Sequence, residues 1–92
     1  MINIEVSNGK YSFSSINYFN ECIAPRYKLV LIKECYNEDW KTAMAKGLGS
    51  IPKDTEFEVF GLMQNMYGYY FIIYYEGNNY YINMLSTKMM KK

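Results

Sequence analysis

Apolar and polar residues alternate at the start of the chain. Ile2, Ile4 and Val6 are separated by polar side chains, which predicts a strand with one buried face. An Asn8-Gly9 pair follows at once, and this pair favours a two-residue hairpin turn because both turn positions need a positive φ. Alternation then resumes over residues 11–15, so the chain should open on a β-hairpin.

Two short stretches have helical spacing instead. Ile16, Phe19 and Ile23 form one apolar stripe, and Pro25 should end this helix because the residue before a proline avoids the helical region. A second short helix is predicted near residues 38–46, after Asn37 as a plausible N-cap. Trp40 and Met44 would share one face of it.

The second half of the chain has the pattern of strands. Phe57 and Val59 alternate with acidic residues, and Gly61 is typical of a bulge. Residues 69–75 contain no charged or amide side chain, which predicts a strand covered on both faces or offered to a partner. Glu76-Gly77 begins a tight hairpin, and residues 80–85 form the returning strand.

Length and charge limit the classes of protein to consider. Ninety-two residues make a single domain, residues 1–92, and the patterns above make it mainly β with short helices, an α+β arrangement. The net charge of +1 gives no overall field that would select nucleic acid. No apolar run is long enough to span a membrane, and the start of the chain lacks the features of a signal peptide, so we expect a cytoplasmic protein.

The sequence contains few of the side chains that enzymes commonly use for catalysis. There is no histidine, the usual general acid–base group and a frequent zinc ligand. Cys22 and Cys35 are interpreted as buried reduced thiols. Glu56 and Glu58 lie two apart and should share one solvated strand face. We therefore expect no enzyme, no cofactor and no metal.

The tyrosines are the unusual feature of the composition. There are eleven, and most of them crowd into two adjacent predicted strands, on both faces. Cross-strand pairs that stabilise a thin sheet would explain them, but tyrosine is also enriched at interfaces and stacks on nucleic-acid bases. The candidate contact residues are Tyr69, Tyr74, Tyr75, Tyr80 and Trp40, with Glu56 and Glu58 as acids that could face a basic partner.

Residues from about 27 to 90 resemble the Src homology 3-like small β-barrel, in its bacterial form. The similarity lies in residues 51–59, which resemble the diverging turn and the next strand, in residues 68–72, which resemble the start of the central strand, and in residues 76–82, which resemble the tight hairpin. The resemblance implies a small barrel. Residues 1–24 would form a hairpin and helix extension outside it. The proline of the polyproline-binding members is replaced by Asn83, so that activity is not implied.

These features predict a non-enzymatic protein-binding module. Within this class a stand-alone regulator or inhibitor of a larger protein is favoured, because a lone domain acts by occupying a surface. The composition resembles small phage or mobile-element proteins of low-GC bacteria, among which an anti-defence protein such as an anti-CRISPR would fit. Two alternatives remain open: a small barrel that binds single-stranded nucleic acid, and a structural subunit that associates with itself as a homo-oligomer.

Overall fold

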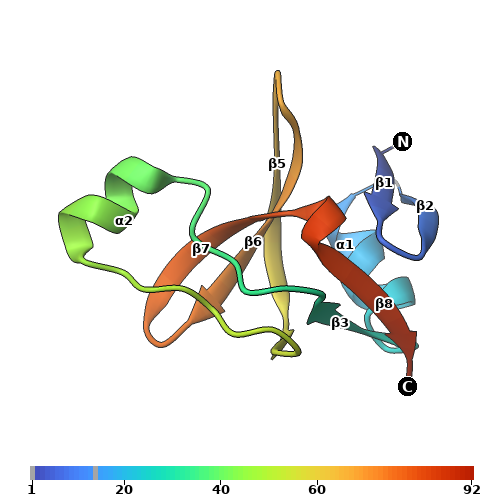
Figure 1. Cartoon of the computed structure of the whole chain (residues 1–92). Coiled ribbons are helices and arrows are strands. Elements are labelled where there is room, and N and C mark those ends of the chain that lie inside the picture. Colours follow the sequence, from blue (N-terminus) through green and yellow to red (C-terminus); the bar gives the residue numbers. More distant parts are fainter. Residues whose placement is uncertain (1, 14) are drawn as a thin grey trace.

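In the part of the chain that the structure describes, eight antiparallel strands form three small sheets, and short helices lie in the connections (Figure 1). The computed structural model describes residues 2–13 and 15–92, with the side chains of residues 6–9 and 15–92. The chain is mainly β, as predicted. The strands are β1 (Ile2–Val6), β2 (Gly9–Phe13), β3 (Tyr27–Leu31), β4 (Glu56–Phe57), β5 (Val59–Asn65), β6 (Gly68–Tyr75), β7 (Asn78–Asn83) and β8 (Thr87–Lys91).

The N-terminal part is a hairpin followed by a short irregular helix, as the sequence predicts. β1 and β2 pair from Ile2–Phe13 to Val6–Gly9, so the two turn residues are Ser7 and Asn8. The prediction of Asn8 and Gly9 as the turn positions is wrong by one residue, because Gly9 already pairs as the first residue of β2 and neither Ser7 nor Asn8 has a positive φ. The burial predicted for Ile2 and Ile4 falls on side chains outside the described part. The helix begins as α1 (Ile16–Tyr18), where the hydroxyl of Ser15 accepts a hydrogen bond from the Tyr18 N–H at 3.1 Å. It continues as a π-helix, η1 (Phe19–Ile23), and ends before Pro25.

One long stretch of strand passes from one sheet to the other. β4 pairs with β3, and β3 pairs with β8, which gives the order β4-β3-β8. At Glu58 the strand is interrupted, and β5 then pairs with β6 to give the order β5-β6-β7. The chain between residues 56 and 65 therefore belongs to two sheets, and the sheets diverge at the interruption.

The hairpins of the second sheet follow the predicted turn chemistry. The register between β5 and β6 shifts between Val59 and Gly61, which confirms the predicted bulge. Glu76 and Gly77 connect β6 to β7 with φ values of 47° and 85°, as a type I′ turn requires. A 3-10 helix, η2 (Met84–Ser86), leads from β7 into β8.

Among the described side chains, an apolar cluster joins these elements. It includes residues from both three-stranded sheets and from the N-terminal segment. Phe19 of η1 is 1% exposed, and its ring lies 5.9 Å from that of Phe71 at the centre of β6. The predicted extension is thus part of the core, whose members are Val6, Phe19, Leu29, Leu31, Cys35, Ile51, Val59, Phe71, Ile73, Tyr80, Ile82, Met84 and Met89.

The long connection between β3 and β4 contains the second predicted helix, α2 (Trp40–Lys46), which projects away from the sheets (Figure 1). Its N-cap is Asp39 and not Asn37, because the Asp39 carboxylate accepts from both the N–H and the hydroxyl of Thr42. Gly47 ends it in the left-handed conformation. No residue of α2 is buried, so Trp40 and Met44 face solvent.

Candidate functional site

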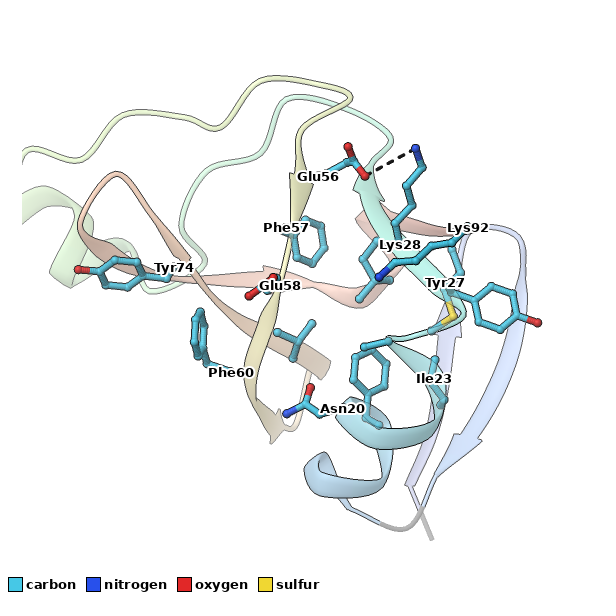
Figure 2. Close-up of a pocket in the computed structure, with 15 residues that line it drawn as sticks. Asn20, Ile23, Tyr27, Lys28, Glu56, Phe57, Glu58, Phe60, Tyr74 and Lys92 are labelled. Carbon is cyan, nitrogen blue, oxygen red and sulfur yellow. Dashed lines mark ion pairs between the residues drawn. The ribbon is translucent and has the colours of Figure 1, made fainter.

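A groove opens where β3 and β5 separate (Figure 2). β3 pairs with β4 at Leu29–Phe57, but the first residues of β3 pair with β8 alone. After Phe57 the strand turns away from β3 and joins β6 as β5. The two strands no longer share hydrogen bonds beyond this point. The space between them has a volume of about 800 Å³ and is open to solvent.

The floor of the groove is apolar. η1 forms one wall, β4 and β5 form the opposite wall, and β3 and β8 close one end. Figure 2 shows the ring of Phe57 and the side chain of Ile23 facing this space from opposite walls. The floor belongs to the core cluster itself, since its residues include Phe19, Leu29, Phe57, Val59 and Met89.

Two exposed aromatic rings stand at the mouth of the groove. Phe60 on β5 and Tyr74 on β6 are 63% and 58% exposed, and their rings meet edge to face at 6.2 Å. Residues 56, 58 and 60 follow the two-residue period of a strand, so Phe60 lies on the same face as both acids. This pair gives the groove an aromatic shelf, defined here as Phe60 and Tyr74.

Charges of both signs lie along the groove. The Lys28 Nζ lies 3.6 Å from the Glu56 Oε1, so these two side chains offset each other. Glu58 lies next along the strand, is exposed, and makes no ion pair with any described residue. Lys92 lies across the groove (Figure 2). Of the groove's charged groups that make no ion pair with a described residue, the Glu58 carboxylate is therefore the one nearest in sequence to the aromatic shelf.

Three of the predicted contact residues meet at this groove. Tyr74, Glu56 and Glu58 all line it. Phe60 was missed by the sequence analysis, although its spacing from Glu58 places it on the same exposed face. The signal was obscured because the adjacent Gly61 indicates a bulge, which makes the facing of residue 60 ambiguous from sequence.

The other tyrosines predicted as contact residues are Tyr69, Tyr75 and Tyr80, and these side chains pack against the core. Tyr69 and Tyr75 are half-buried against the core, and Tyr75 packs edge to face on Tyr80 at 5.8 Å. Tyr80 is 4% exposed, and its hydroxyl donates to the Gly49 carbonyl at 3.0 Å. β7 turns this ring into the core, so Tyr80 offers little surface to a partner, and its role as a contact residue stays a prediction. Trp40 is 61% exposed but lies on α2, outside the groove.

The two cysteines differ in environment. Cys35 is buried, and burial raises the pKa of its thiol above the ordinary value. Cys22 is exposed on η1, so the prediction that both thiols are buried is wrong for this residue. Both are free thiols.

Within residues 2–13 and 15–92, no three His, Cys, Asp or Glu side chains lie close enough to hold a metal ion. No helix in the described part of the chain is long and apolar enough to cross a membrane. The groove combines an apolar floor with the two exposed rings of Phe60 and Tyr74 and with the Glu58 carboxylate, which makes no ion pair with a described residue. These are the properties of a binding surface.

Comparison with protein families, with curated proteins and with solved structures finds no match.

Proposed function

We propose that this protein is a non-enzymatic binding module that acts in the cytoplasm as a stand-alone regulator or inhibitor of a larger protein. The observation that carries the proposal is the aromatic shelf at the mouth of an apolar groove. Exposed aromatic rings beside a concave apolar surface are typical of protein-binding hot spots, because they bury large areas at low entropic cost. An anti-defence protein of phage or mobile-element origin is the kind of inhibitor that this proposal includes.

The charge at the groove favours a protein partner over nucleic acid. Glu56 and Glu58 balance Lys28 and Lys92 along its walls. A surface that binds single strands combines stacking rings with an excess of positive charge that follows the phosphates. This groove has the rings without that excess, and a carboxylate next to them repels a phosphate backbone.

We also propose that β3 to β8 form a Src homology 3-like small barrel. The strand order β4-β3-β8 and β5-β6-β7 supports it, because one interrupted strand serves both sheets. The 3-10 turn η2 before the last strand supports it further, as does the long connection after the first strand. In this proposal η1 packs beside the barrel where β3 and β5 separate, and so builds the second wall of the groove.

Affinity capture with matched variants tests the proposed function. Wild-type protein, Tyr74→Ala, Phe60→Ala and the control Tyr36→Ala are each immobilised and exposed to lysate of the natural host. Tyr36 is 67% exposed and lies outside the groove, so it matches Tyr74 in type and exposure. We expect one larger protein to be recovered by wild type and control, and at least about tenfold less by the two groove variants.

Other recoveries would contradict the proposal. Equal capture by all four proteins would show that the partner does not bind at the aromatic shelf. Recovery of nucleic acid with an affinity that falls steeply with salt would favour the single-strand-binding alternative. Concentration-dependent self-association in sedimentation, lost in Tyr74→Ala, would favour the homo-oligomeric subunit.

A further inference from the structure

Asn37 closes the free edge of β7. An outer strand presents unpaired N–H and C=O groups, which can template pairing with another chain. The Asn37 side-chain oxygen accepts from the Tyr81 N–H at 3.0 Å, and its nitrogen donates to the Asn79 carbonyl at 3.2 Å. The Glu38 N–H adds a bond to the Tyr81 carbonyl at 2.8 Å. One side chain thus reproduces the pair of hydrogen bonds that a neighbouring strand would make.

Asn8 closes the free edge of β8 in the same way. Its side-chain nitrogen donates to the Met89 carbonyl, and its oxygen accepts from the Met89 N–H at 3.1 Å. The Ser7 N–H donates to the Thr87 carbonyl at 2.8 Å. Two outer strands of the three-stranded sheets are therefore capped by an asparagine and an adjacent backbone N–H.

The edge of β5 that faces the groove has no such cap. β6 occupies one side of β5, and no described strand pairs with β5 on the other side. Glu58 lies in the interruption before β5, and Phe60 is the residue skipped at the bulge. Residues 59–65 contain no charged side chain, whereas charge is a common device that keeps an edge strand from pairing. Val59 and Phe60, at the start of this stretch, line the groove next to the point where β3 stops pairing.

The side chains along this edge favour a positively charged residue. Glu58 has no ionic partner among the described residues, because Glu56 is the acid that pairs with Lys28. Phe60 and Tyr74 stand next along the same face. An Arg or Lys side chain placed over these rings would gain a cation–π contact and an ion pair with the Glu58 carboxylate.

We propose that the groove binds an extended peptide segment of the partner protein, which adds as a strand to the edge of β5 and places an Arg or Lys between Glu58 and the aromatic shelf. The proposal rests on the proposed function and names the chemistry of its partner. Backbone hydrogen bonds to β5 supply affinity, the apolar floor takes an alternate side chain of the segment, and Glu58 selects its charge.

Display of random linear peptides against the purified full chain provides the probe. We expect enriched peptides to carry Arg or Lys flanked by alternating apolar residues. Glu58→Gln should weaken their binding at least about tenfold, and the matched control Glu38→Gln, an exposed acid that does not line the groove, should change it less than about twofold. N-methylation of single peptide amides should reduce binding at every second residue, which is the period of strand pairing.

The outcomes separate this inference from the proposed function. Peptides that lose binding with Tyr74→Ala but tolerate Glu58→Gln and N-methylation would overturn strand addition while leaving the groove as a protein-binding site. Enrichment of acidic peptides, or of none, would overturn the inference, and the capture experiment would still decide the proposed function. A dimer in sedimentation that is lost with Phe60→Ala would assign the groove to a second copy and overturn the partner peptide.

Discussion

Asn37 is 5% exposed, and both its amide oxygen and its amide nitrogen are bonded to other parts of the chain. Its oxygen also accepts from the Asp39 N–H at 3.0 Å, which orients the residue that caps α2. One side chain therefore holds the long connection to β7 and positions the start of the projecting helix. Such a buried and fully bonded polar group is costly to remove, because its partners stay behind without it.

Asn37→Ala is predicted to lower the free energy of unfolding by about 1–3 kcal/mol, because the Tyr81 N–H and the Asn79 carbonyl lose their partners. Urea unfolding measures the change. The matched variant is Asn8→Ala, which removes the equivalent cap of β8 from an exposed side chain, where water can replace it. Asn8→Ala should therefore cost less, and an equal or greater loss would contradict the importance of burial at Asn37.

Tyr80 is predicted to make the protein less stable in alkali. Burial, with smaller contributions from Glu76 and Tyr75, raises the pKa of its phenol in the folded state. Above a pH of about 10 the unfolded chain loses this proton first, so the free energy of unfolding falls as pH rises through the folded pKa. Tyr80→Phe should flatten this decline.

The same substitution should cost about 1 kcal/mol at neutral pH, because the hydrogen bond to the Gly49 carbonyl is lost. Urea unfolding at neutral pH and above pH 10 or so measures both effects. Tyr74→Phe, which removes an exposed phenol, is the control and should keep the slope of the wild type. A Tyr80→Phe slope equal to that of the wild type would contradict the prediction.

At the scale of elements, the turn between β6 and β7 contains a residue, Glu76, whose type does not favour the backbone conformation that it adopts. Glu76 has a φ of 47° and Gly77 a φ of 85°. A type I′ turn favours asparagine at the first position and glycine at the second, because side chains rarely adopt positive φ. The glutamate is therefore held in place by the pairing of the two long strands on either side.

Glu76→Asn is predicted to raise the free energy of unfolding by about 0.5–1 kcal/mol, because asparagine tolerates this conformation better. Thermal unfolding measures the shift. Gly77→Ala is the opposing variant: nothing lies within 4 Å of the added carbon, so its predicted loss of about 1 kcal/mol arises from backbone strain alone. An increase in stability for Gly77→Ala would exclude the type I′ geometry.

The projecting helix α2 is attached to the rest of the protein by hydrogen bonds and not by buried side chains. It contains no buried residue, and its position depends on the hydrogen bonds of Asn37 and Glu38 to β7. Its apolar residues Trp40 and Met44, 61% and 74% exposed, add little to the core. Helical spacing placed them on one face, but spacing alone does not say whether that face meets another element.

At the scale of the whole molecule, the N-terminal segment and the sheets share one core. Phe19 is 1% exposed and contacts Phe71, and Val6 is 4% exposed in the same cluster. The same η1 residue forms part of the floor of the groove. Packing of Val6 and η1 onto the sheets therefore builds part of the core, and η1 also builds part of the candidate site.

Phe19→Ala is predicted to lower the free energy of unfolding by about 3–5 kcal/mol, as expected for the removal of a fully buried ring. If this variant does not fold, Phe19→Leu provides the measurement, with a smaller loss of about 1–2 kcal/mol. Tyr18→Ala, at a neighbouring residue that is 45% exposed, should change stability by less than about 0.5 kcal/mol. Equal effects at Phe19 and Tyr18 would show that η1 lies outside the core.

Local patterns were enough to predict most of the elements. The stripe of Ile16, Phe19 and Ile23 and the alternation around Phe57 led to the observed helix and strand. The Asn8-Gly9 pair led to the hairpin but placed its turn one residue late, because Gly9 pairs with Val6. These features depend on neighbours in sequence, through turn geometry and periodic burial. The bulge at Gly61 and the turn at Glu76-Gly77 were predicted for the same reason.

The sequence by itself determined that the protein is mainly β, where most turns lie, and that aromatic and acidic residues are the candidates for contact, because these depend on residue type and short-range spacing. Tertiary structure decided which candidates meet. It turned Tyr80 inward, set Trp40 on a projecting helix, and brought Tyr74 beside Phe60 and Glu58. The reason is physical: the facing of a side chain depends on which strand lies beside its own, and the divergence of β3 from β5 is set by packing between segments far apart in the chain.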